Sequence, residues 1–398
     1  MSVQIKDRIE SRIDPDEIVR RVRSVLPKSE SKVALHEPRF TGNERAYLND
    51  CIDTGWVSYA GAYVGRFEAA IAAACGVEHA VAVTSGTVAL QIALTITGVQ
   101  PNDEVLVPAL TFVASANAVV HAGAVPHFVD ADEDTLGISS SSLTQHLDEI
   151  GELRGSTLFN KRTGRRISAI LPVHIFGHPV DMDELNDIAA RYGLIVIEDA
   201  TEALGSRYKN RPCGSLAPLA ALSFNGNKLV TTGGGGAILT NDAVVAARIR
   251  HLTTTAKTPH RWSFLHDEVA WNFRLPNINA ALGLAQIEQL APSIAMKRVL
   301  QQKYAAAFAD MPGVRVFEEP SFATSNYWLV ALVLDDAQAD LLEPILLATN
   351  DAGIMTRPLW TPMHLLPMYS DNPRAPLPKT EGLAKRILNV PSSPFLAQ

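Results

Sequence analysis

Short apolar segments alternate with helical segments along most of the chain. A run of a few apolar residues is typical of a buried strand, and apolar positions three or four apart are typical of a helix. Strands that alternate with helices form an open sheet with helices on both faces. The pattern therefore predicts an α/β fold, with strands at 80–83, 104–108, 125–129, 167–173, 194–197, 220–224 and 237–240.

The N-terminal part departs from this alternation. Residues 1–34 are charged, and within them Asp14 can cap a helix that has Pro15 at its first position. From residue 35 to 67 the chain is rich in loop-forming residues and has little periodicity. Within this stretch, residues 54–61 are either a plain connection or a loop that contacts substrate, and we favour the second interpretation.

The C-terminal part also differs. After predicted helices over 278–290 and 292–308, a strand at 328–334, a helix at 341–352 and a strand at 354–357 indicate a second, smaller unit. We predict three regions: an N-terminal helical extension at 1–34, a large domain at 35–290 and a small C-terminal α/β domain at 291–398.

The composition fits a large folded protein, because 47% of the 398 residues are hydrophobic. The net charge of −7 argues against nucleic acid as a partner, since that binding rests on Lys and Arg. The three cysteines are scattered and predict neither a metal site nor a disulfide framework, so we expect a reducing compartment, the cytoplasm. We find no signal-peptide core and no apolar run long enough to span a membrane.

One lysine stands out as candidate chemistry. Lys228 ends the polar turn Ser223–Lys228 and is followed by four glycines at 233–236. Glycine permits close approach of the backbone, which suits a lysine that must bond to a carbonyl group. Asp199 ends an apolar strand, and a carboxylate is what a pyridine cofactor needs at its ring nitrogen. Taken alone, each residue is more often a surface lysine or a strand-end aspartate.

A candidate anion site comes earlier in the chain. Ser85, Gly86 and Thr87 follow a strand and open a helix, and the free amides of a helix N-terminus favour phosphate. An ordinary helix cap has the same residues. However, this turn, Phe112, Asp199 and Lys228 all lie near the ends of predicted strands, where open α/β sheets bind ligands.

Several motifs resemble a known family in order and spacing. They are Gly55-Trp56-Val57-Ser58, Ser85-Gly86-Thr87, Pro108 to Ser115, Pro172 to Gly177, Glu198-Asp199-Ala200, Ser223 to Lys228 and Asn272-Phe273-Arg274-Leu275. With these motifs the chain resembles the fold-type I, pyridoxal-phosphate-dependent nucleotide-sugar aminotransferases of the DegT/DnrJ family. The resemblance implies a three-layer α/β/α large domain with a mostly parallel sheet, as in aspartate aminotransferase.

Three further segments are similar to the 4-aminotransferases of legionaminic-acid-type pathways. They are Leu35-His36-Glu37-Pro38, Asn160 to Arg165 and His251 to Lys257. This resemblance implies that an amino acid, L-glutamate, donates its amino group to the C4 keto group of an N-acetylated, nucleotide-linked 4-keto-6-deoxy hexose for a surface glycan. A 3-aminotransferase and a GDP-perosamine-type synthase stay open as alternatives. A non-catalytic cofactor-binding sensor is the alternative of another class.

The family resemblance also implies a role for individual residues. Lys228 would be the Schiff-base lysine and proton carrier, and Asp199 would hold the pyridine nitrogen protonated. Phe112 would stack on the ring. Gly86, Thr87 and Ser223 would hold the phosphate, and Asn272 would reach it from the second subunit of a homodimer. Separately, Phe112 could be a core residue and Asn272 a helix cap.

One position departs from the commonest family pattern. Many relatives carry Gln three residues after the aspartate, whereas this chain has Glu202, which is expected near the phenolic oxygen of the cofactor. Related dehydratases replace the lysine with histidine, so Lys228 favours an aminotransferase. Candidates for the substrate pyrophosphate are Arg154, Arg165, Arg261 and Arg357, although a surface charge is the more ordinary role for each.

Overall fold

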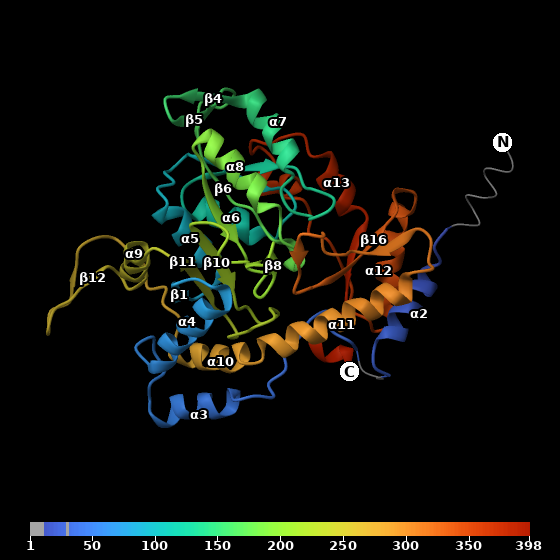
Figure 1. Ribbon diagram of the computed structural model, residues 1–398, viewed down its shortest axis with the longest axis horizontal. Coiled ribbons are helices and arrows are strands. Elements are labelled where there is room, and N and C mark those ends of the chain that lie inside the picture. The colour runs from blue at the N-terminus through green and yellow to red at the C-terminus, as the bar shows by residue number, and fades with distance from the viewer. Residues whose placement is uncertain (1–11, 29–31) are drawn as a thin grey trace.

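The computed structural model describes residues 12–28 and 32–398 and has a mostly parallel sheet at its centre (Figure 1). Only β11 runs against its neighbours along the main path, because it pairs antiparallel with both β1 and β10. In spatial order the path is β1 (His79–Val83), β11 (Gly236–Thr240), β10 (Leu219–Ser223), β7 (Ile195–Asp199), β6 (Arg166–Ile170), β2 (Glu104–Pro108) and β3 (Val125–Val129).

Helices cover both faces of this sheet, as the alternation in the sequence predicts. Successive strand residues enter opposite cores: Ala80 and Ala82 pack on one side, and Val81 and Val83 on the other. The first face carries α4 (Ala62–Cys75), α7 (Ser140–Ile150), α8 (Met182–Tyr192) and α10 (Asn277–Ile287). The second carries α5 (Gly86–Ile96), α6 (Val113–His121) and α9 (Ala243–Thr253). The three-layer α/β/α architecture is thereby confirmed.

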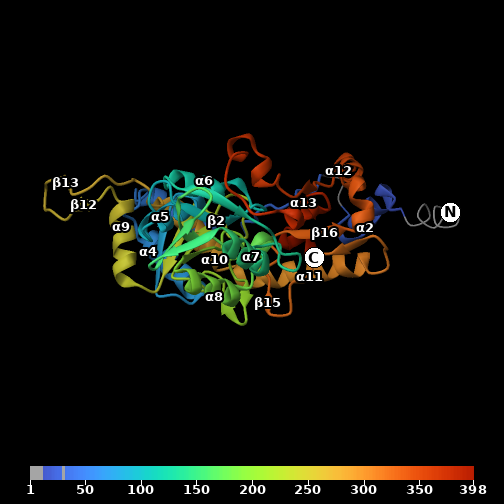
Figure 2. The ribbon, with the colours of Figure 1, turned by 90° about the horizontal axis from the view of Figure 1, so that it is seen from above.

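The C-terminal elements form a second sheet beside the long helix α11 (Leu290–Phe308) (Figure 2). Its strands are β14 (Val314–Val316), β16 (Val330–Leu334), β18 (Ile387–Val390) and β17 (Arg357–Pro358), with α12 (Leu342–Asp351) and α13 (Pro378–Ala384) nearby in the chain. Among the described residues, no helix is both long and apolar enough to cross a lipid bilayer.

The N-terminal helix α2 (Pro15–Val25) packs against α11 and α12 and buries Ile18 and Val22 in their core. Asp14 caps it through the amide of Asp16, as predicted, at 3.0 Å. Residues 1–11 and 29–31 of the predicted extension lie outside the described residues. The division at residues 34 and 290 stays a prediction.

Two expectations about individual elements need correction. The stretch 35–67 contains α3 (Glu44–Asp53), which the pattern missed because polar bonds rather than an apolar stripe fix its start: Gln286 Nε2 donates to the buried Glu44 at 2.7 Å. The expected strand at 354–357 is instead a single bridge of Ile354 to Val33, followed by β17.

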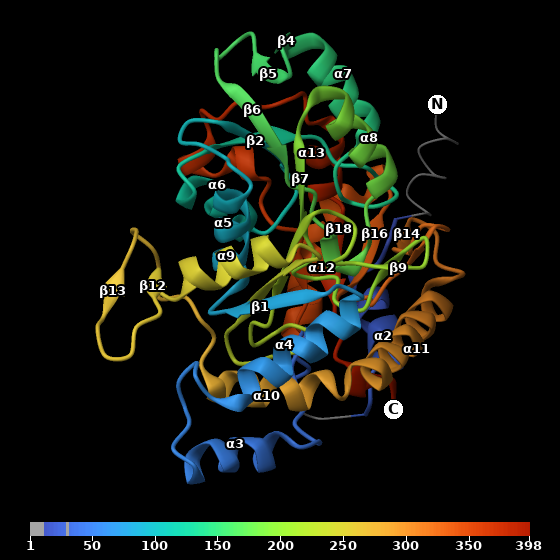
Figure 3. The same cartoon turned by 60° about the vertical axis from the view of Figure 1, so that its left-hand side comes forward.

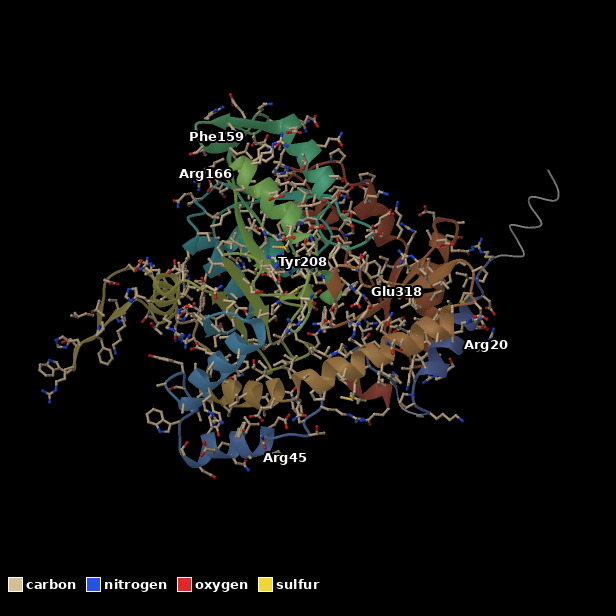
Figure 4. All side chains as sticks on the ribbon, viewed as in Figure 1. Arg20, Arg45, Phe159, Arg166, Tyr208 and Glu318 are labelled. Carbon is tan, nitrogen blue, oxygen red and sulfur yellow. The ribbon has the colours of Figure 1, made fainter. Side chains whose placement is uncertain are left out.

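Two loops contain short hairpins. The segment after residue 253, expected to be irregular, contains the strands β12 (Lys257–Thr258) and β13 (Leu265–His266), which project from the body (Figures 1 and 3). The basic stretch at 151–166 forms a hairpin, one of the two forms expected, from β4 (Gly151–Arg154) and β5 (Thr157–Asn160). Figure 4 labels Phe159 and Arg166 at this end of the molecule.

A buried polar cluster ties this hairpin to the sheet. The Glu104 carboxylate accepts from Asn160 Nδ2 at 2.8 Å and lies 2.8 Å from His127 Nδ1. His127 Nε2 lies 2.8 Å from His146 Nε2, so only one of these two nitrogens can carry the shared proton. Burial, helped by the charges of His127 and Arg162 and opposed by Glu104, lowers the pKa of His146 to about 4.

This cluster predicts a loss of stability in mild acid. A histidine with a folded pKa near 4 and an unfolded value near 6.5 stays neutral in the native state while the unfolded chain takes up a proton. The contribution of this histidine to the free energy of unfolding is complete above pH 6.5 and falls as the pH drops toward 4. We expect His146→Gln to weaken the pH dependence of the urea-unfolding midpoint between pH 6.5 and 4.5. The slope will not vanish, because burial also lowers the pKa of His178 to about 3.

The matched control is His121→Gln, which changes an exposed histidine at the end of α6. Its midpoint should follow the unmodified protein at every pH. If His146→Gln keeps the full pH slope, the cluster does not govern acid stability.

Candidate functional site

A cavity of about 330 Å³ lies where the carboxyl ends of β1, β2, β7 and β10 meet. This edge is where open α/β sheets bind ligands. Seven residues singled out in the sequence line the cavity together: Gly86, Thr87, Phe112, Asp199, Glu202, Ser223 and Lys228. The fold therefore brings together residues that are up to 142 positions apart in the chain (228 − 86 = 142).

The first turn of α5 forms one wall of the cavity. The Ser85 hydroxyl caps the amide of Val88 at 3.2 Å, and Gly86 and Thr87 line the cavity at the helix N-terminus. A Cβ atom on Gly86 would lie 2.8 Å from Cβ of Ser223, so only glycine lets this turn approach the end of β10. First-turn amides and an adjacent hydroxyl make a fitting seat for a phosphate.

Asp199 forms the floor at the end of β7, and its side chain is almost fully buried. The Ser115 hydroxyl donates to its Oδ2 at 2.7 Å, and the Thr201 amide donates to Oδ1 at 3.2 Å. Thr111 Oγ1 lies 3.1 Å from the Ser115 hydroxyl and continues this network. The bonds fix the orientation of a carboxylate that suits a protonated ring nitrogen.

Lys228 and Glu202 both line the cavity, and their side chains are in contact. Lys228 Nζ lies 3.3 Å from Glu202 Oε1, while the Phe176 amide donates to Oε2 at 2.8 Å. Burial raises the pKa of the Glu202 carboxyl above its ordinary value, and the Lys228 charge and the Phe176 bond oppose this shift. Phe176 adopts the left-handed conformation, with φ of 55°, which is costly for a residue other than glycine.

Aromatic rings complete the cavity wall. Phe112 is half exposed, and its ring centroid lies 6.1 Å from that of Trp360. Trp328 also lines the cavity, with its ring centroid 3.6 Å from Lys228 Nζ. Phe112 is therefore a half-exposed residue of the cavity wall and not a core residue.

Asn272 does not line this cavity. It is exposed and forms an isolated bridge with Thr254, beside the projecting β12–β13 hairpin. The next but one residue, Arg274, is nearly buried and donates to Glu68 Oε1 at 2.8 Å, which anchors the segment to α4. Within one chain, Asn272 thus lies outside the cavity, although its neighbour Phe273 accepts from the Thr84 amide at 3.0 Å, next to the Ser85–Thr87 turn.

Sequence reasoning gave no individual role to several cavity residues, among them Ser115, Thr201, Trp328 and Trp360. Ser115 could have been found, since it closes the Pro108–Ser115 motif. The two tryptophans could not, because they come from the C-terminal part and reach the cavity only in the folded chain. The four candidate arginines do not line the cavity; Arg154, for example, pairs with Glu152 on the distant β4–β5 hairpin.

His174 lies behind the site and has a structural role. It is fully buried, its Nε2 lies 3.0 Å from Glu198 Oε1, and the Val180 amide approaches its Nδ1 at 3.3 Å. The Leu216 amide donates to the other Glu198 oxygen at 2.9 Å. The backbone amide of His174 also donates to the Asp199 carbonyl at 3.2 Å, so this group supports the strand end that carries Asp199.

A cavity with a lysine, a buried carboxylate and a phosphate seat on this fold defines a pyridoxal-phosphate-dependent enzyme. Residues 38–398 match the DegT/DnrJ/EryC1/StrS aminotransferase family, and the chain belongs to it. The enzyme is accordingly a sugar aminotransferase that uses pyridoxal phosphate.

Known relatives cover nearly the whole chain. The chain is 36% identical over 365 residues to GDP-perosamine synthase of Escherichia coli O157:H7, which covers 92% of this chain and 94% of that protein. It is 35% identical to the dTDP-3-amino-3,4,6-trideoxy-alpha-D-glucose transaminase of Streptomyces venezuelae, over 83% of this chain and 82% of that protein. The crystal structure of DesI with its TDP-sugar product has a TM-score of 0.79 and 30% identity, over 91% and 88% of the two chains.

The bonds to Asp199 predict the effect of removing its charge. Asn keeps the shape but cannot stabilise a protonated ring nitrogen, and one pKa unit corresponds to about 1.4 kcal/mol. We expect Asp199→Asn to retain the cofactor, measured by absorbance after gel filtration, and to lose at least tenfold in turnover. A variant that kept most of its rate would make the carboxylate structural.

Proposed function

We propose that this enzyme transfers an amino group from L-glutamate to the C4 keto group of a nucleotide-linked, N-acetylated 4-keto-6-deoxy hexose. The product would enter the synthesis of a surface glycan. The observation that carries the proposal is the cavity in which Lys228, Glu202 and Asp199 meet beside a phosphate seat. The three cysteines of the chain are free and buried, which suits a reducing compartment. We propose that the enzyme acts in the cytoplasm.

The cavity residues divide the work of this reaction. Bound pyridoxal phosphate supplies an aldehyde that bonds to amines and a ring that accepts an electron pair from the substrate carbon. Asp199 holds positive charge at the ring nitrogen, and the first turn of α5 with Ser223 holds the phosphate. Lys228 Nζ would carry a proton between the substrate carbon and the C4′ carbon of the cofactor, away from the amino-acid carbon in the first half-reaction and onto the sugar carbon in the second. Glu202, 3.3 Å away, orients the amine.

The relatives keep two alternatives open. A GDP-linked substrate is favoured by the similarity to GDP-perosamine synthase, and a C3 amino product by the similarity to the dTDP-3-amino sugar transaminase. Their identities to this chain, 36% and 35%, are nearly equal, so the identities do not rank them. A sensor without turnover would need no catalytic lysine, and Lys228 with its two partners speaks against it.

A substrate panel tests the proposal. The purified protein is incubated with glutamate and UDP-, GDP- and dTDP-linked 4-keto sugars, with and without N-acetylation, and products are identified by mass spectrometry and their position by NMR. We expect a 4-amino product from an N-acetylated sugar, and loss of at least a hundredfold in Lys228→Ala. A 3-amino product or a preference for a GDP-linked sugar without the acetamido group would replace the proposed substrate. Cofactor absorbance that ignores every donor would favour the sensor.

We further propose a homodimer that shares its two active sites. Asn272 lies outside its own cavity, and it adjoins the projecting β12–β13 hairpin. This hairpin exposes large apolar side chains, with Trp262 73% and Phe264 79% exposed, which is typical of a surface that another chain covers. The loop at 54–61, which we expected to contact substrate, does not line its own chain's cavity, and Trp56 is 57% exposed.

Mixed dimers test the shared site. When Lys228→Ala and Asn272→Ala chains combine, one site carries both defects and the other carries neither. If Asn272→Ala alone lowers activity, we expect mixing to raise activity per Asn272→Ala chain, after two affinity tags have shown that subunits exchange. If activity does not rise in a verified mixed dimer, Asn272 does not serve the partner's site, and the aminotransferase assignment is unaffected.

A further inference from the structure

Trp328 is attached to the segment that carries Lys228. Its indole Nε1 donates to the carbonyl of Asn227 at 2.8 Å, and Asn227 directly precedes the lysine. Its ring centroid lies 3.6 Å from Lys228 Nζ, close enough for an attractive contact between an ammonium group and an aromatic face. The indole ring is therefore hydrogen-bonded to the backbone next to Lys228 and also contacts the Lys228 side chain.

The backbone of Trp328 is fixed as firmly as its ring. Its amide donates to Asn326 Oδ1 at 2.7 Å, and the buried Lys297 donates to its carbonyl at 3.0 Å. Asn326 is fully buried and donates through Nδ2 to the carbonyl of Glu202 at 2.9 Å. One segment of the C-terminal part thus holds the backbone beside both Glu202 and Lys228.

We propose that Trp328 is a positioning residue that holds the free Lys228 amine against Glu202. The inference rests on the assignment of Lys228 as the lysine that bonds to the cofactor. In a transamination this lysine is released and must later act again, so a fixed location for the free amine shortens its return. Glu202 holds the amine by charge at 3.3 Å, and the indole face confines it from another direction.

The cofactor-free protein offers a direct test. Lys228 is acetylated with a trace of acetic anhydride at pH 8, and the modified peptide is quantified by mass spectrometry. Trp328→Leu and Trp328→Met remove the aromatic face, so we expect the labelling rate of Lys228 to rise about fivefold, the size of one such contact. Trp328→Phe keeps a ring face and should stay within twofold of the unmodified protein.

Trp360→Leu is the matched control, because Trp360 lines the same cavity and has no ring contact with Lys228 among the described residues. If the labelling rate of Lys228 depends only on access to the cavity, it will also rise in Trp360→Leu, and the proposal fails. Equal rates in Trp328→Leu, Trp328→Met and the unmodified protein also overturn it. Thermal unfolding identifies folded variants, and the Phe and Met variants suffice where Leu does not fold.

Two further measurements separate this proposal from the function on which it rests. Loading the unmodified protein with pyridoxal phosphate should protect Lys228 from acetylation; without protection, the lysine assignment itself fails. In stopped-flow reactions of loaded enzyme with glutamate, we expect Trp328→Met to lower the maximal rate about tenfold with the half-saturating glutamate concentration within twofold. A change in the half-saturating glutamate concentration alone, with the maximal rate unchanged, would make Trp328 a substrate-binding residue and overturn the positioning role.

Discussion

The contact between Lys228 Nζ and Glu202 Oε1 is the interaction on which the site depends. It places a flexible amine at a fixed point, 3.3 Å from a carboxylate that is itself held by the Phe176 amide. The contact requires β7 and β10 to be neighbours in the sheet, because Glu202 follows the first strand and Lys228 the second. A parallel pair carries both residues to one edge, where their side chains can meet.

The protein supports buried charges in this region with hydrogen bonds, as the cost of burying unpaired charge requires. Glu198 receives bonds from His174 and two backbone amides, and Glu68 pairs with Arg250 and Arg274. The strained backbone at Phe176 fits the same account, since its left-handed conformation directs an amide to Glu202. Strain that the surrounding structure holds in place is common at functional sites.

The C-terminal part contributes side chains to the cavity and holds the backbone beside it. Trp328 lies beside Lys228, Asn326 holds the backbone at Glu202, and Trp360 lies near Phe112. Asn326 also explains Gly177, where a Cβ atom would lie 1.9 Å from Asn326 Oδ1. Polar contacts of Asn326 therefore link the C-terminal part to the backbone at Glu202, beside the cavity.

The sequence alone determined the features that depend on neighbouring residues. Short apolar runs that alternate with helical segments predicted helices on both faces of a sheet, and Ser85-Gly86-Thr87 and Asp199 were predicted because strand ends and helix starts have local signals. The helix α3 was missed, since its start is fixed by Gln286, more than two hundred residues away. Tertiary structure alone brought Trp328 to Lys228, placed Trp360 near Phe112 and kept Asn272 outside the cavity. Those positions are set by the packing of the C-terminal part on the sheet edge, and such long-range contacts leave no periodic pattern in the sequence.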